Sequence, residues 1–158
     1  MKLMKIIAVS ALCSILGLAM VSAQEAKEKE PSKEEKAVTA RQDMMHVLAA
    51  QRGILRDMAD GKRDTDAVKF TNAATALAAL AKMIPEAFTL NAIVGESTAK
   101  PEIWTKPDDF AAKASALSDK VGAIAKLAAT DIEGAKAMVK DIKECGGCHD
   151  DYRVEEKQ

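Results

Sequence analysis

The amino-acid sequence predicts an all-α fold, an antiparallel up-down-up-down bundle of four helices. Apolar side chains recur at steps of three and four residues along four segments, as they do on the buried face of a helix. Most joints between these segments are short, which places neighbouring helices antiparallel. We find no β-hairpin signal and no internal repeat, and a length of 158 residues suits a single domain.

The first predicted helix runs from about Ser32 or Lys33 to Asp60. Ser32 is followed three residues later by Glu35, which is the pattern of a capping box at a helix start. Gly61 stands where a glycine commonly ends a helix. The stripe that should face the core consists of Val38, Arg41, Met45, Leu48, Arg52 and Leu55.

The second predicted helix begins near Asp64 or Asp66 and should stop at Pro85 or just before it. Its stripe consists of Phe70, Ala74, Leu77, Ala81 and Ile84. Regular periodicity then fails until Pro107, so we expect a long connection that contains at most a short helical turn. Such a connection in a compact domain is usually functional or packed against another element.

The third predicted helix runs from about Asp108 to Ala129, and its stripe consists of Phe110, Ala114, Leu117, Val121, Ile124 and Ala128. The fourth begins near Asp131, a candidate N-cap residue. Its stripe continues to the C-terminal region through Ala135, Met138, Ile142, Cys145, His149 and Tyr152. We expect this segment to form one helix whose apolar face completes the bundle.

The sequence Cys145-Gly146-Gly147-Cys148-His149 lies on this last helix. C-x-x-C-H is the attachment signature of a c-type haem, in which each thiol adds to one vinyl group and the imidazole ligates the iron. On a helix, Cys145 and His149 share a face and Cys148 lies beside it. We therefore predict one covalent haem c inside the bundle, where it would fill volume that an alanine-rich core leaves open.

Two other interpretations of the paired cysteines fit less well. A redox dithiol of this spacing is expected in a βαβ context, which the sequence lacks. A structural zinc site needs four ligands, but the remaining Cys is Cys13 in the N-terminal segment and the remaining His is His46.

Residues 1–23 have the pattern of a secretory signal peptide, with a basic start, the apolar run Ile6–Ala19 and a small residue, Ala23, before the expected cleavage. The apolar run is too short to span a bilayer comfortably. Residues 24–36 form a charged lead-in that we expect to be solvated, and residues 37–158 form the haem-binding domain. We expect a soluble protein in the periplasm of a Gram-negative bacterium, without a membrane anchor. A net charge of −1 gives no support to nucleic-acid binding.

With the haem motif on its last helix, the chain resembles the cytochrome c′ family, the class II c-type cytochromes. The resemblance covers essentially all of the mature chain and is carried by residues 41–45, 101–104 and 145–153. Ala40 departs from the pattern, because many members have an aromatic residue before the arginine. The resemblance implies a four-helix bundle that encloses one haem c, which agrees with the prediction from periodicity.

Within this family, the residue four positions after the arginine occupies the distal side of the haem. Here that residue is Met45, which implies six-coordinate iron with His149 and Met45 as ligands and a role in electron transfer. If Met45 only packs the core, the resemblance implies five-coordinate iron that binds nitric oxide or another small gas. Met44 and His46 are the alternative ligands on the same helix.

Three further side chains are candidate haem contacts. Arg41 lies one turn from Met45 and is predicted to reach a haem propionate, unless it is solvated and paired with a nearby carboxylate. Arg153 is predicted to shield the proximal side or a propionate, and Trp104 to cover a haem edge or a bundle end; solvation and plain packing are the respective alternatives. We expect an electron carrier rather than an enzyme, which serves unidentified redox partner proteins as a monomer or homodimer.

Overall fold

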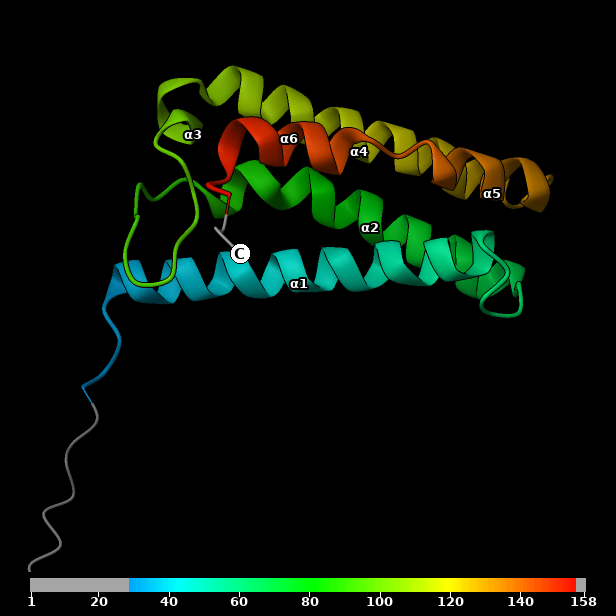
Figure 1. Cartoon of the computed structure of the whole chain (residues 1–158), viewed down its shortest axis with the longest axis horizontal. Helices are drawn as coiled ribbons and strands as arrows, with labels where there is room; N and C mark the ends of the chain where they lie inside the picture. The colour runs from blue at the N-terminus through cyan, green and yellow to red at the C-terminus, as the bar shows by residue number, and fades with distance from the viewer. Residues whose placement is uncertain (1–28, 156–158) are drawn as a thin grey trace, which may run out of the picture. The chain divides into compact units, whose positions relative to one another are not determined.

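The computed structural model describes residues 29–155, and the predicted signal peptide lies outside them. The helices in this part of the chain are α1 Lys33–Ala59, α2 Ala67–Ala87, α3 Glu102–Thr105, α4 Pro107–Leu127, α5 Ile132–Lys140 and α6 Glu144–Tyr152. They belong to one compact unit that begins at Pro31. Helices α1, α2 and α4, together with α5 and α6 in succession, form the predicted four-helix bundle (Figure 1).

Helix α1 begins and ends as its sequence predicts. The Ser32 hydroxyl accepts a hydrogen bond from the Glu35 backbone N–H at 3.1 Å, and the Glu35 carboxylate accepts one from the Ser32 backbone N–H at 2.6 Å. These bonds satisfy two donors that a helix start leaves without intrahelical partners. Gly61 follows the helix with φ of 71°, a conformation that glycine adopts without steric cost.

Helix α2 differs from its prediction at its end. Asp66 caps the start as expected, accepting a hydrogen bond from the Lys69 backbone N–H at 2.9 Å. The prediction that Pro85 stops the helix is wrong, because α2 contains Pro85 and ends at Ala87. Proline in a helix lacks an N–H donor and its ring crowds the carbonyl four residues earlier, but Pro85 lies in the last turn, where the Phe88 N–H still donates to the Pro85 carbonyl at 3.1 Å.

The fourth bundle element is two helices rather than the single helix that was predicted. Helix α5 ends at Lys140, and α6 begins at Glu144 after a break at residues 141–143. Asp141 disfavours a helix interior, because its side chain competes for backbone hydrogen bonds. Ile142 nevertheless remains buried at the break, so the predicted apolar stripe continues from α5 into α6 although the helix does not.

The core lies between the predicted stripes. Its most deeply buried large side chains are Leu55 and Met58 of α1, Phe70 and Leu77 of α2, and Val121 and Ile124 of α4. Alanines at 74, 81, 114 and 135 are also buried and let the helices approach closely. Among the described residues, no helix combines the length and apolar character needed to cross a membrane.

Residues 88–101 connect α2 to α3, and we call them the strap. Figure 1 shows the strap passing over α1 at one end of the bundle before it returns to α3. It also contacts the residues that follow α6, since Ala99 and Arg153 form an antiparallel bridge. The long connection is therefore packed against two elements, and it contains the predicted helical turn as α3 at its end.

Candidate haem site

A cavity of about 790 Å³ opens between α1 and α6. Its walls come from α1, α2, α3, α4, α6 and the strap, and their surface is mostly apolar. Volumes of roughly 300–1,000 Å³ are typical of sites that hold small molecules and cofactors. The space therefore suits a prosthetic group rather than a few water molecules.

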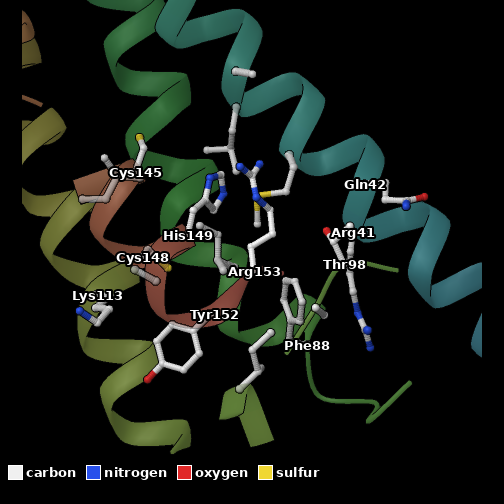
Figure 2. A pocket seen from close by; sticks show the side chains of 18 of the residues that line it. Arg41, Gln42, Phe88, Thr98, Lys113, Cys145, Cys148, His149, Tyr152 and Arg153 are labelled. Carbon is white, nitrogen blue, oxygen red and sulfur yellow. The ribbon is translucent and has the colours of Figure 1, made fainter. Parts of the chain in front are cut away.

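Helix α6 brings the three residues of the haem motif to this cavity. Figure 2 shows Cys145, Cys148 and His149 together on that helix, and all three are partly buried and line the cavity. The two thiols are free. Burial raises the pKa of each thiol, and it does so more than the charge of Arg52 lowers that of Cys145 or the charge of Lys113 lowers that of Cys148.

The imidazole of His149 is available as a ligand. Within residues 29–155, no hydrogen bond engages its ring. Its pKa is lowered mainly by burial and further by the positive charge of Arg153, against a smaller opposing effect of Asp150. The neutral form that binds a metal is therefore favoured.

Helix α1 supplies the opposite wall. The three candidate distal ligands on this helix differ in whether they are buried and whether they line the cavity. Met45 is partly buried and lines the cavity. His46 also lines it but is exposed, whereas Met44 is partly buried outside the lining. The cavity therefore favours Met45 over Met44, as the sequence pattern does.

Arg41 is buried, with only 4% of its surface exposed, although it also lines the cavity. Its guanidinium donates to the backbone carbonyls of Ala87 and Ala92, each at 2.9 Å, and to that of Leu90. The alternative of a solvated, carboxylate-paired arginine is wrong, since no described carboxylate lies within ion-pair distance. Two of the five N–H donors of a guanidinium are left over, so contact with a propionate stays a prediction.

The other two predicted haem contacts have different surroundings. Arg153 is exposed, and in Figure 2 its side chain extends beside His149 along the cavity wall. Trp104 lies outside the lining, where its indole N–H donates to the Phe88 carbonyl at 2.7 Å. Its ring also lies 6.4 Å from the Phe88 ring, so the packing role is observed and the haem-edge role stays a prediction.

Sequence reasoning missed the part of the site that does not lie on the helices. Residues 96–99 of the strap line the cavity, as does Phe88 at the start of the strap. Phe88 packs edge-on against Phe110 with ring centroids 5.2 Å apart, and Phe110 packs in the same way against Tyr152 at 5.1 Å. An isolated aromatic residue directly after a helix was the available signal, but periodicity does not identify it.

The residues present fit a covalently attached haem. Two free thiols and an imidazole without a hydrogen bond face one largely apolar cavity of sufficient volume. A thioether side chain lines the same cavity from the facing helix. This combination of soft sulfur, imidazole and apolar surface is the usual environment of a c-type haem.

The family model described as Cytochrome C′ matches residues 36–153. A cytochrome c-554 from Cereibacter sphaeroides is 37% identical over 124 residues, which cover 75% of this chain and 81% of that protein. The structure of cytochrome c prime from Shewanella frigidimarina superposes with a TM-score of 0.68 at 31% identity, covering 79% of this chain and 99% of that one.

A nitric oxide complex of a mutant cytochrome c prime from Alcaligenes xylosoxidans superposes with a TM-score of 0.70 at 29% identity. The match covers 80% of this chain and all of that one. The residues matched by the family model run from the first turn of α1 to the end of α6 and include the C-x-x-C-H motif. The chain belongs to the cytochrome c′ family, whose members carry one covalently bound haem c.

Proposed function

We propose that this protein is a soluble periplasmic electron carrier with one haem c, attached through Cys145 and Cys148 and ligated by His149 and Met45. The observation that carries the proposal is that Met45 and His149 line one cavity from two facing helices. An imidazole and a thioether on opposite sides of a haem form the ligand set of electron-transfer cytochromes.

The haem supplies a one-electron change at iron, and the chain's own residues determine how that change proceeds. Thioether sulfur is a soft ligand that suits haem iron, and ligation by His and Met raises the reduction potential. The apolar walls formed by residues such as Val38, Leu48 and Leu117 keep water from the iron. Arg41 and Arg153 are the proposed contacts of the propionates, and Trp104 is the proposed cover of a haem edge.

The second candidate is a five-coordinate protein that binds nitric oxide or a similar small gas. A related structure is described as a nitric oxide complex. Apolar Val38 and Leu48 line the α1 wall near Met45, so a small gas would find an apolar distal surface if the sulfur did not ligate iron. The two candidates thus differ in what Met45 does.

The ferric spin state and the reaction of the ferrous protein with carbon monoxide distinguish the candidates. We expect a low-spin ferric protein that binds carbon monoxide slowly, and we expect a Met45→Leu variant to become high-spin, with faster binding and a lower reduction potential. Met44→Leu is the matched control, because Met44 lies on the same helix outside the cavity lining. A high-spin wild type that binds the gas rapidly would support the second candidate instead.

The remaining expectations concern the whole protein in its compartment. The mature protein should begin at Gln24 after cleavage of the signal peptide and carry the mass of one haem. It should exchange electrons with partner proteins as a monomer or homodimer. Mass spectrometry of protein exported by a host that matures c-type cytochromes tests the cleavage site and the attachment together.

A further inference from the structure

One side chain of α1 holds the start of the strap. The guanidinium of Arg41 binds the carbonyls of Ala87, Leu90 and Ala92, so it engages the chain where it leaves α2 and turns into the strap. The same group lies over the Phe88 ring, 4.7 Å from its centroid, in cation–π geometry. One turn of chain is therefore wrapped around one buried cation.

The far end of the strap is bonded to α6. The Val154 N–H donates to the Thr98 carbonyl at 2.8 Å, and the Lys100 N–H donates to the Tyr152 carbonyl at 3.0 Å. The Lys100 ammonium also donates to the Asp150 carbonyl at 2.8 Å. These bonds lie one to five residues beyond His149, so this end of the strap moves with the haem-bearing helix.

The strap thus spans the cavity that separates α1 from α6. Arg41 precedes Met45 by one helical turn, and the α6 attachment follows His149 by about one turn. Between these points, the Gln42 side-chain amide donates to the Glu96 carbonyl at 3.0 Å, and residues 96–99 line the cavity. A connection that joins the two walls next to the proposed ligands limits how far those walls separate.

We propose that Arg41 is a positioning residue that, by clamping the strap between α1 and α6, sets the separation at which Met45 reaches the haem iron. This inference rests on the proposed ligation by Met45. It gives Arg41 a function that does not require contact with the haem. Met45 then competes with exogenous ligands for the iron only while the strap holds α1 and α6 together.

The chemistry of the clamp requires arginine. The planar guanidinium directs several N–H donors along fixed directions, which allows it to hold three carbonyls at once. Burial lowers the pKa of Arg41, yet a guanidinium remains protonated in proteins, so the charge persists. A lysine at this position keeps a cation near the cavity but presents a compact ammonium on a flexible stem, which does not reproduce the three bonds.

The test compares Arg41→Lys and Arg41→Met with the wild type as haem-loaded proteins. Arg56→Met is the matched control, because Arg56 is 60% exposed on the same helix and lies outside the cavity lining. Three quantities are measured: the ferric spin state, the rate of carbon monoxide binding to the ferrous form, and amide hydrogen exchange at Lys100 and Val154. Circular dichroism checks that the variants keep their helices.

We expect both Arg41 variants to gain high-spin ferric protein. Carbon monoxide binding and exchange at the two amides should accelerate by about tenfold, the effect of losing one to three hydrogen bonds. The control should match the wild type. If Arg41→Lys restores wild-type behaviour, charge alone suffices and the clamp is refuted, since a propionate contact needs only the cation.

Lys100→Met extends the test to a variant that should fold, because it removes only the side-chain bond between the strap and α6. We expect a smaller acceleration of carbon monoxide binding, about two- to fivefold. A low-spin wild type whose Arg41 and Lys100 variants bind the gas at the wild-type rate would overturn the clamp and leave the proposed function intact. A high-spin wild type would instead refute Met45 ligation and therefore both.

Discussion

The hydroxyl of Tyr152 makes one of the contacts that join the haem-bearing helix to α4. Its ring is buried against Phe110, and its O–H donates to the Asp109 carboxylate at 2.5 Å. Burial, followed by this hydrogen bond, raises the pKa of Tyr152 above its ordinary value. The residue therefore fixes the end of α6 against α4 three positions beyond His149.

Replacing Tyr152 by Phe should lower the free energy of unfolding by about 1 kcal/mol at neutral pH, because one net hydrogen bond is lost and Asp109 remains accessible to water. The folded-state pKa is raised, so the tyrosine contributes stability that is complete below its unfolded pKa of about 10 and is lost as pH rises above it. Urea unfolding at pH 7 and above pH 10 measures this. A difference between the two proteins that stays constant across this range would contradict the assignment.

At the scale of the elements, the predictions that depend on one segment were accurate. The capping box at Ser32, the cap at Asp66 and the buried stripes all follow from side chains within a few residues of each other. The errors concern where helices end or break. Pro85 stays helical, and the break after α5 leaves Ile142 buried. Helix propensity is a weak prior, so neither a proline nor an aspartate fixes a helix end by itself.

Gly147 provides a prediction about α6 itself. The glycine is helical and exposed, no atom lies within 4 Å of an added Cβ, and it does not line the cavity. Gly147→Ala should therefore raise the free energy of unfolding by roughly 0.5–1 kcal/mol. Gly61→Ala is the opposite control and should lower it by about 1–2 kcal/mol, since Gly61 has φ of 71°. Thermal unfolding of the haem-loaded proteins measures both changes in stability. Destabilisation by Gly147→Ala would show that a group outside the chain, such as the haem, requires glycine at this position.

At the scale of the whole molecule, the site is predictable only where the sequence motif itself supplies its residues. Cys145, Cys148 and His149 are adjacent in sequence, and Met45 follows from the family pattern. The strap is different, because its position at the cavity depends on hydrogen bonds between its backbone and two partners, the Arg41 side chain of α1 and the end of α6. Carbonyl acceptors carry no side-chain signature, so neither composition nor periodicity predicts that Arg41 binds them.

We predict that one half of the bundle stays folded without haem and that the other half does not. Phe70 of α2 packs in the core with Val121 and Ile124 of α4, and all three are fully buried away from the cavity. By contrast, α6 and the middle of α1 face each other across a space of about 790 Å³. Without haem, the largely apolar walls of this cavity would face water, so we expect them to collapse together or separate.

A Cys145→Ala, Cys148→Ala double variant, prepared free of haem, tests this division. Amide hydrogen exchange should show loss of protection in α6, the strap and the α1 turn around Met45, while the amides near Phe70 and Val121 remain protected. Thermal stability should fall markedly from that of the haem-loaded protein, because covalent haem fills the space and joins its walls. Equal loss of protection in all the helices would show instead that the bundle folds as one unit around the haem, and that α2 and α4 have no independent stability.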